Sequence, residues 1–455
     1  MPPPLPKPAS IPKTIAAHRA KGVKYGLATF VDVHGVSKGK IVPIDHWPQM
    51  FAGSELFTGF AVDGVPQQVN EEEVAARPDA AAGAICPWNR EVAWFPSDLW
   101  CRGEPFAACS RNILKRQVRA AADLGYVMHL GIETEFFVLR DGPDGRMRIP
   151  GPRDTLAKPC YDVAGFLDNY AWLDELVTAM NDLGWDVYSF DHEDANGQFE
   201  TDFDYADALT MADRFTFFRL LVKEITAKHG LYPTFMPKPF ADRTGSGAHY
   251  NMSLADRSGR RNLFTDAKDP RGCGLSRLGY AFIAGVLRHA AAITAVIAPT
   301  VNSYKRLTRR QNASGFTWAP IYQCYGDNNR TNMLRIPLGG GRVECRAADI
   351  GCNLYLGAAM MLAAGLEGVR EDLDPGEPNR DNMYAVPFAE VRRRGIDLLP
   401  QTLGEAVEAF AADPLSRTVF GDAMFESFVA LKRQEWSDYH AHVSDWEIDR
   451  YLKLW

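Results

Sequence analysis

Two glutamates stand two residues apart inside a run that otherwise reads as a buried β-strand. The run is Gly131-Ile132-Glu133-Thr134-Glu135-Phe136, and strand alternation places Glu133 and Glu135 on the same face. An exposed edge strand is the simpler interpretation of such a pair, but the apolar neighbours favour a central strand. Two unpaired carboxylates buried there would repel each other. The chain must therefore fold so that cations compensate this face.

Further metal ligands occur in other segments. In His192-Glu193-Asp194-Ala195-Asn196-Gly197-Gln198-Phe199-Glu200, a glycine turn lets the chain fold back and aim Glu193 and Glu200 at one point. His249 lies in a glycine-rich stretch and Glu344 in an apolar one, although a single histidine is more often an ordinary core or surface residue. Five carboxylates and one imidazole suit hard divalent ions, and the imidazole favours Mn²⁺ or Mg²⁺ over Ca²⁺. We expect at least two ions.

Several arginines provide the cationic counterpart. They are Arg330, Arg335, Arg342 and Arg346. A guanidinium group can bind carboxylate or phosphate through two parallel hydrogen bonds. Ordinary surface arginines are the alternative, which fits poorly with neighbours such as Leu334 and Val343. Several metals together with arginines are typical of phosphoryl transfer.

The chain has 455 residues, enough for two domains. Two β-rich runs joined by a turn at Gly35 begin a small N-terminal domain, and helical periodicity starts near Ser110, the predicted N-cap. We predict an N-terminal domain over residues 1–108, with a flexible proline-rich arm, and a second domain over 109–455. Strands and helices alternate in the second domain without a glycine-rich phosphate loop, so nucleotide binding would use carboxylates and metals.

The charge and hydrophobic composition of the chain indicate which classes of partner it can bind. The formal net charge is −7 and no long Lys/Arg run occurs, so nucleic acid is not expected. The N-terminus lacks the apolar segment of a secretory signal, which predicts a cytoplasmic protein. The most apolar stretch, residues 275–300, contains Arg277, Arg288 and His289. We interpret it as a core helix and expect no membrane segment.

The ordered motifs resemble the glutamine synthetase superfamily over nearly the whole chain. They are GIETEF, HEDANGQFE, TFMPKPF, GSGAHYNMSL, APTVNSYKRL, NNRTNMLRIP and RVECRAADIGCNLYL. The resemblance implies an α+β fold: an N-terminal β-grasp domain and a catalytic domain with an antiparallel sheet flanked by helices. It also implies a homo-oligomer, a dodecamer of two stacked hexamers, with active sites between subunits.

The resemblance assigns roles by position. Two or three Mg²⁺ or Mn²⁺ ions are implied: one would be held by Glu135, Glu193 and Glu200, and another by Glu133, His249 and Glu344. Glutamate would be held by Arg306, Arg346 and Gly245. ATP, the co-substrate, would be contacted by Asn251, Ser253, Arg335 and Arg342. Arg330 would stabilise the transferred phosphoryl group. The implied reaction forms γ-glutamyl phosphate, which an uncharged amine attacks.

The chain departs from the family pattern where the amine is chosen. Direct counting places Asn312 where glutamine synthetases have a flap glutamate, and Leu307 to Tyr325 contains no glutamate. The family's ammonium-binding aspartate, contributed by a neighbouring subunit, corresponds to Phe57-Thr58-Gly59 here. Asp63 nearby is either a substitute or a turn residue. Asn312 and Asp63 are thus the candidate catalytic residues on the acceptor side.

These departures favour an alkylamine over ammonia. Loss of anionic ligands weakens a small hydrated cation more than an alkylamine, which gains about 0.8 kcal/mol per buried CH₂-sized group. The loop also supplies apolar side chains, among them Phe316, Trp318, Ile321 and Tyr322. This region resembles the branch that includes γ-glutamylmethylamide synthetases. We predict a ligase joining glutamate to methylamine. Ammonia is the alternative acceptor, and a catalytically silent ring-forming protein is a third interpretation, disfavoured by the six filled ligand positions.

Overall fold

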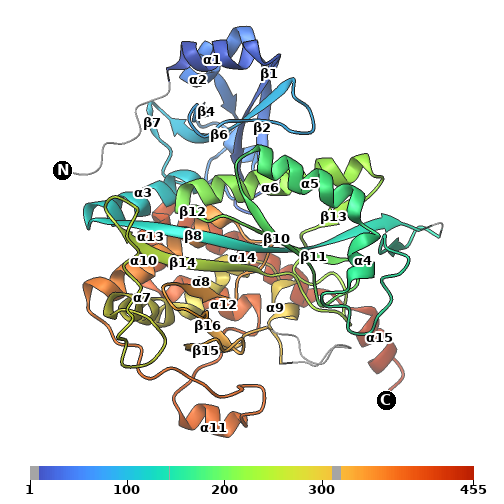
Figure 1. Cartoon of the computed structure of the whole chain (residues 1–455), viewed down its shortest axis with the longest axis vertical. Helices are drawn as coiled ribbons and strands as arrows, with labels where there is room; N and C mark the ends of the chain where they lie inside the picture. The colour runs from blue at the N-terminus through green and yellow to red at the C-terminus, as the bar shows by residue number, and fades with distance from the viewer. Residues whose placement is uncertain (1–9, 143, 310–318) are drawn as a thin grey trace.

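The computed structural model describes residues 10–142, 144–309 and 319–455. It has the predicted mixed α+β fold, with a smaller sheet near the N-terminus and a larger sheet in the body of the molecule (Figure 1). The start of the proline-rich arm, Asn312, Phe316 and Trp318 lie outside the described residues.

The smaller sheet begins with the predicted hairpin. Strands β1 (Tyr25–Val31) and β2 (Ser37–Pro43) are antiparallel, and Gly35 in the turn has a φ of 76°. The order is β2-β1-β6-β4-β3, in which β1 and β6 run parallel, and β5 and β7 pair with β6. The remaining strands are β3 (Glu55–Phe57), β4 (Val74–Pro78), β5 (Ala84–Ile85), β6 (Val92–Cys101) and β7 (Glu104–Pro105). Helices α1 (Ile11–Ala20) and α2 (Trp47–Ala52) contribute Ile15, Trp47 and Met50 to a core shared with Phe95.

The larger sheet has the order β10-β11-β8-β14-β17-β16-β15. Its pairs are antiparallel apart from β15 and β16, which run parallel. These strands are β8 (Tyr126–Asp141), β10 (Val187–His192), β11 (Gln198–Phe203), β14 (Ala248–Asp256), β15 (Tyr322–Asp327), β16 (Asn332–Ile336) and β17 (Val343–Cys345). Three shorter strands also pair with β8: β9 (Met147–Arg148), β12 (Ala206–Asp207) and β13 (Tyr232–Thr234).

Strand alternation gives β8 two different faces. Its even-numbered side chains from Met128 to Phe136 are buried in the main hydrophobic core, against helices that include α3 (Ser110–Asp123) and α6 (Ala208–Lys228). The odd-numbered side chains, among them Glu133 and Glu135, leave the opposite face. The sheet therefore offers polar groups on one side while the helices seal the other.

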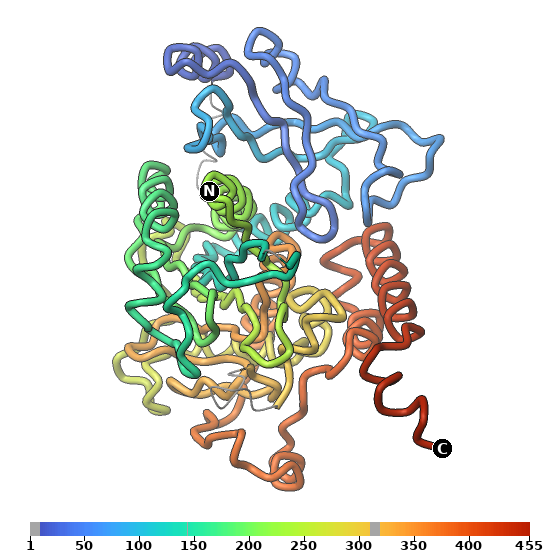
Figure 2. The backbone as a smooth tube through the Cα atoms, turned by 90° about the vertical axis from the view of Figure 1, so that its right-hand side faces the viewer, coloured from blue at the N-terminus to red at the C-terminus, as the bar shows by residue number. Residues whose placement is uncertain are grey.

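The remaining helices cover the sheet and continue to the C-terminus. They are α4 (Val163–Leu167), α5 (Tyr170–Asp182), α7 (Arg277–Arg288), α8 (Ala290–Ile297), α9 (Ser303–Arg306), α10 (Leu354–Arg370), α11 (Phe388–Arg393), α12 (Leu403–Ala412), α13 (Pro414–Phe420), α14 (Asp422–Ala441) and α15 (Asp445–Tyr451). Figure 2 shows α14 rising beside the body towards the N-terminal sheet and the chain end projecting away from it. Ser427 of α14 donates to the carbonyl of Gly64 at 3.1 Å.

Two local predictions are wrong. Ser110 is the first residue of α3, and Cys109 occupies the N-cap without a side-chain cap. The stretch over residues 275–300 is buried in the core as predicted, but it forms two helices, α7 and α8, bent by 77° at His289, instead of one. No single described helix is long and apolar enough to cross a membrane, and this bent pair meets that test only when both helices are counted together.

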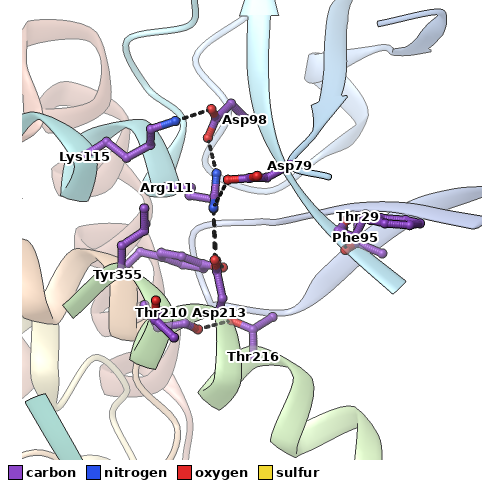
Figure 3. Close-up of polar contacts among 12 residues, drawn as sticks. Thr29, Asp79, Phe95, Asp98, Arg111, Lys115, Thr210, Asp213, Thr216 and Tyr355 are labelled. Carbon is purple, nitrogen blue, oxygen red and sulfur yellow. Dashed lines mark hydrogen bonds and ion pairs between the residues drawn. The ribbon is translucent and has the colours of Figure 1, made fainter. Parts of the chain in front are cut away.

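A buried network of ion pairs connects the N-terminal sheet with helices of the body (Figure 3). Arg111 on α3 binds Asp213 of α6 through two hydrogen bonds of 3.0 Å. The same guanidinium reaches Asp98 on β6 at 2.7 Å and Asp79, just after β4, at 3.0 Å. Tyr355 of α10 donates to Asp213 at 2.6 Å. The network therefore ties the N-terminal sheet to three helices of the body; the domain boundary at residue 108 itself stays a prediction.

Candidate active site

Strand register brings most of the predicted site together on one face of the large sheet. Glu200 on β11 lies opposite Glu135 on β8, and Glu133 on β8 lies opposite His249 on β14. Glu344 on β17 then lies opposite both Asn251 and Arg335 on its two neighbouring strands. Residues opposite one another in antiparallel strands share a face, so the pairing itself creates the site.

A cavity of about 550 Å³ opens over this face. The predicted residues that line it are Glu133, Glu135, Glu193, Glu200, Gly245, His249, Arg306, Arg330, Arg335 and Arg346. Glu344 is fully buried at the edge of the same cluster. The cavity thus combines acidic groups with four arginines.

The carboxylates and the imidazole fall into groups compact enough for a metal ion. One contains Glu133, His249 and Glu344, and a second contains Glu135, Glu200 and His249, with one ligand atom of each member within 4.8 Å of the others. The first group is the ligand set predicted for one ion. The second shares two members with the other predicted set. Carboxylate oxygens with one imidazole nitrogen suit Mg²⁺ or Mn²⁺.

Glu193 lines the cavity but belongs to neither group in the described residues. Its carboxylate accepts a hydrogen bond of 3.0 Å from the amide of Asp194. The predicted hairpin is present, because β10 and β11 pair around Gly197, which has a φ of 76°. The turn therefore delivers Glu193 to the cavity, with its carboxylate directed partly back onto its own backbone.

Burial and mutual repulsion raise the pKa values of several crowded carboxyl groups in the cavity. Burial and the nearby charge of Glu135 raise the pKa of Glu193 to about 8. Burial and Glu193 raise the pKa of Glu200 well above its usual range, and burial and Glu133 raise that of Asp202 to about 7. The Oδ1 atom of Asp202 is buried without a hydrogen-bond partner among the described residues. Bound cations would offset the repulsion between these carboxylates and would give the Asp202 oxygen a partner.

His249 lies between the two glutamates of β8. Its Nδ1 is 2.8 Å from Glu133 and its Nε2 is 3.5 Å from Glu135. Burial acts to raise the pKa of Glu133, but hydrogen bonding and charge from His249 lower it to about 2. Asn251 adds a hydrogen bond of 2.9 Å to Glu133. Glu133 therefore stays ionised where its neighbours resist ionisation.

Three of the predicted arginines are held by the site itself. Glu344 accepts from Arg335 and from Arg346, each at 2.6 Å. Arg306, 5% exposed, donates to the carbonyls of Ala347 and Arg346, each at 3.0 Å. Arg330 is exposed at the cavity and its guanidinium forms no salt bridge within the part of the chain that the structure describes. Arg330 is therefore the arginine most available to an anionic ligand.

Gly245 is required by close packing. A Cβ atom at this position would lie 2.5 Å from the carbonyl of Pro237 and 2.8 Å from Cγ of Arg306. The Gly245 carbonyl accepts a hydrogen bond of 3.0 Å from Gln198. Any side chain here would displace Arg306 or the backbone that faces the cavity.

Three of the four predicted nucleotide residues line a second cavity of about 390 Å³, and the fourth, Arg335, lines the first. Asn251, Ser253 and Arg342 are part of the wall of the second cavity, and Arg342 donates to Asn251 at 3.1 Å. Glu133 and Asp202 line both cavities. The two spaces therefore meet at the metal-ligand face.

Sequence reasoning missed several cavity residues. Asp202 follows Glu200 by two positions on β11, and Asp191 pairs opposite Glu200, so alternation around Glu200 was the available signal. Asp191, Glu200 and Asp202 form a third compact acidic group. Cys160 and Tyr161 also line the cavity, and no motif pointed to them.

Asp63, one of the two acceptor-side predictions, is not brought to the cavity of its own chain. Asp63 lines neither cavity among the described residues and lies 3.5 Å from Nε2 of His34, exposed on the N-terminal domain. Asn312 lies outside the described residues. Both assignments stay predictions.

Comparison with known proteins gives consistent matches. The model of the glutamine synthetase catalytic domain matches residues 107–451. A glutamate–methylamine ligase of Methyloversatilis universalis is 44% identical over 95% of this chain and 97% of its own length. A glutamine synthetase of Rhizobium leguminosarum bv. phaseoli is 39% identical over 96% and 98%. A solved structure described as a GmaS/ADP complex superposes with a TM-score of 0.90 at 40% identity, over 96% of this chain and 99% of that one.

Proposed function

Because this chain belongs to the glutamine synthetase family, we propose that it is an ATP-dependent ligase that joins the γ-carboxyl group of glutamate to methylamine. One observation carries the proposal: two compact groups of carboxylates and an imidazole lie where an arginine-lined cavity meets a second, smaller cavity. Phosphoryl transfer between two bound anions needs this combination of metal ligands and guanidinium groups.

Binding of glutamate is assigned to Arg306, Arg346 and Gly245. Both guanidinium groups are buried, so their contact with a carboxylate would be strengthened by the low local dielectric. Arg346 already binds Glu344, and Arg306 is held by two carbonyls. These contacts preorganise the arginines before substrate arrives, which lowers the entropic cost of binding.

ATP is assigned to the smaller cavity, against Asn251, Ser253 and Arg342, with Arg335 at its phosphates. The ligands for the Mg²⁺ or Mn²⁺ ions are Glu133, Glu135, Glu193, Glu200, His249 and Glu344. Such ions neutralise the phosphate charge. The residues fit them, because five of the six form two compact groups of ligand atoms, and the raised pKa values of Glu193 and Glu200 mark carboxylates without enough positive charge nearby.

The reaction then follows from charge and position. A γ-carboxylate oxygen of glutamate takes the γ-phosphoryl group of ATP, which releases ADP, and Arg330 stabilises the charge on the transferred group. The nitrogen of the uncharged amine attacks the acyl carbon of γ-glutamyl phosphate. Phosphate leaves, and the amine loses a proton.

Methylamine is favoured over ammonia by two features. The segment from Leu307 to Tyr325 has no glutamate, so it supplies no anionic ligand for ammonium. Among the described cavity residues, Cys160, Tyr161 and Ala319 present uncharged carbon or sulfur surface. A methyl group gains from such contact whereas ammonium does not. The glutamate–methylamine ligase quoted above is a relative with this named activity.

The experiment is an amine panel with the purified full chain. ATP, glutamate and Mn²⁺ or Mg²⁺ are combined with ammonium, methylammonium or ethylammonium, and the amide product is identified by mass. We expect the highest kcat/KM with methylammonium. A higher kcat/KM with ammonium would assign the chain to glutamine synthesis, and no ADP with any amine would indicate a catalytically silent protein.

We also propose a homo-oligomer, a dodecamer of two stacked hexamers. Asp63 is exposed and outside its own chain's cavity, so it would act only at a neighbouring subunit's site. The C-terminal segment exposes Trp446, Leu452, Leu454 and Trp455, apolar surface that association would bury. Light scattering coupled to gel filtration tests the mass, and a monomeric, fully active protein would contradict the proposal.

A further inference from the structure

A buried carboxylate, Asp154, lies beneath the loop that carries Cys160 and Tyr161. The side chain of Asp154 is fully buried, and that of His192 is 1% exposed. Asp154 Oδ2 accepts from His192 Nε2 at 2.8 Å and from the amide of Gly197 at 2.6 Å, and its Oδ1 accepts from Asn196 at 2.7 Å. One carboxylate thus collects three hydrogen bonds from the turn between β10 and β11.

That turn carries Glu193. His192 immediately precedes Glu193, and Nδ1 of His192 lies 3.0 Å from the Glu193 carbonyl. The amide of Glu193 donates to the carbonyl of Gln198 at 3.0 Å. The orientation of the turn, and with it the position of the Glu193 carboxylate, therefore depends on the hydrogen bonds that Asp154 accepts.

The loop depends on the same turn. Residues 155–158 are exposed, and hydrogen bonds connect this loop to the turn. Tyr161 donates its amide to the His192 carbonyl at 2.8 Å, and Asn196 donates to the Leu156 carbonyl at 3.1 Å. Tyr161 holds a φ of 65°, a conformation that surrounding contacts must maintain.

The loop and the turn form one side of the cavity. Lys158, Cys160 and Tyr161 line the same cavity as Glu193. An uncharged amine needs both a polar group for its nitrogen and an uncharged wall for its carbon. Glu193 supplies the first, and Cys160 with Tyr161 supplies the second.

We propose that Asp154 is a positioning residue that locks the Glu193 turn and the Cys160–Tyr161 loop into one unit, the amine-binding side of the cavity. The proposal rests on the ligase function. Loss of the Asp154 carboxylate would release both parts at once. Binding of the amine and of the divalent ion would weaken together, while glutamate and ATP, assigned to residues outside this turn and loop, would bind as before.

The test compares Asp154→Ala and Asp154→Asn with Asp168→Asn. Asp168 is the matched control, because it accepts two hydrogen bonds from Arg153 in the same loop but none from the turn. KM is measured for amine, glutamate and ATP, Mn²⁺ dependence is titrated, and melting confirms folding. For both Asp154 variants we expect KM for methylammonium and the Mn²⁺ midpoint to rise by roughly 10- to 100-fold. KM for glutamate and for ATP should change less than about twofold, the control staying near wild type.

Two substitutions of His192 test the role of its hydrogen bond to Asp154. His192→Gln keeps an N–H donor for Asp154 and should retain most of the amine affinity, whereas His192→Ala should reproduce the Asp154 defect. A proportional fall in kcat with every KM unchanged would show a purely structural role and overturn the proposal, as would identical behaviour of the two His192 variants. If the wild-type enzyme uses only ammonium, the methylamine proposal fails, and KM for ammonium then tests Asp154 in the same way.

Discussion

His249 and Glu133 face each other across β14 and β8, with Nδ1 of the imidazole 2.8 Å from Oε2 of the carboxylate. The two residues are 116 positions apart in the chain. Their contact keeps Glu133 ionised, with a pKa near 2, beside carboxylates whose pKa is raised. Glu133 is therefore a ligand that is already charged before a cation arrives.

Replacing Glu133 by glutamine should remove that charge while keeping the shape of the side chain. We expect amide formation to fall by at least roughly 100-fold, with a higher Mn²⁺ requirement, because a metal ligand is lost. The rate is measured over a Mn²⁺ titration. Asp256→Asn, at the far end of β14, the strand that carries His249, is the control and should keep wild-type activity. Full activity of Glu133→Gln at low Mn²⁺ would refute the ligand assignment.

Metal binding should be linked to pH. The folded pKa values of Glu193 and Asp202 are about 8 and about 7, both above the ordinary carboxyl range. A raised folded pKa gives stability that is fully present below the unfolded pKa, near 4, and is lost as pH rises to about 8. The metal-free protein should therefore lose stability over this window, and a divalent ion should restore it.

Melting temperatures with Mn²⁺ and with EDTA at pH 6 and pH 8 test this linkage. We expect the gain from Mn²⁺ to be larger at pH 8, because fewer protons must be displaced from the ligands there. Binding at pH 6.5 should also release protons, detectable with a dye in weak buffer. A gain from Mn²⁺ that shrinks as pH rises would contradict the proposed cation site.

Some of this site could be predicted from local sequence and some could not. Alternation alone placed Glu133 and Glu135 on one face, and Gly197 marked the hairpin that delivers Glu200. The register that sets Glu133 against His249 depends on strands distant in the chain, and only family resemblance supplied it. The direction of the Glu193 carboxylate, turned onto the amide of Asp194, follows from a single local hydrogen bond that no pattern encodes.

The bend at His289 shows the same limit in the fold. The apolar run over residues 275–300 predicts one helix, although Arg288 and His289 interrupt its apolar character at the break. The partners of His289 are Asp413 and Glu367, which are 124 and 78 positions away. Tertiary contacts rather than propensity thus end α7 and start α8.

His289 should also make stability depend on pH. Its Nδ1 lies 2.7 Å from Asp413 and its Nε2 2.9 Å from Glu367, so both nitrogens face carboxylates and both donate. Burial opposes the charge, but these hydrogen bonds raise the pKa of His289 above its ordinary value. Arg288, next in the chain, also binds Glu367. The stability that the imidazolium provides is present in full below about pH 6.5 and is lost as pH rises through the folded pKa.

Replacement of His289 by glutamine tests the direction of this pH dependence of stability. Glutamine can keep a hydrogen bond but carries no charge, so wild type should exceed the variant in melting temperature by more at pH 6 than at pH 8.5. Both proteins are compared at equal concentration, because assembly also affects melting. His229→Gln, at a partly exposed histidine that binds Glu175, is the control and should show a smaller pH effect. A wild-type advantage that grows with pH would be inconsistent with a raised pKa.

Removal of the buried Arg111 charge should lower the free energy of unfolding much more than removal of an exposed charge in the same network. Arg111 is 3% exposed and binds Asp79, Asp98 and Asp213, so Arg111→Met would leave three carboxylates facing one another. Breaking a buried ion pair from one side costs about 3–5 kcal/mol, because the remaining charge stays buried without its partner. Lys115→Met is the matched control, since Lys115 binds the same Asp98 from a side chain that is 42% exposed, and such pairs contribute about 1 kcal/mol or less. The free energies of unfolding in urea, measured at fixed protein concentration, should therefore differ by several kcal/mol between the two variants. Equal losses of stability would show that burial of Arg111 does not strengthen its ion pairs.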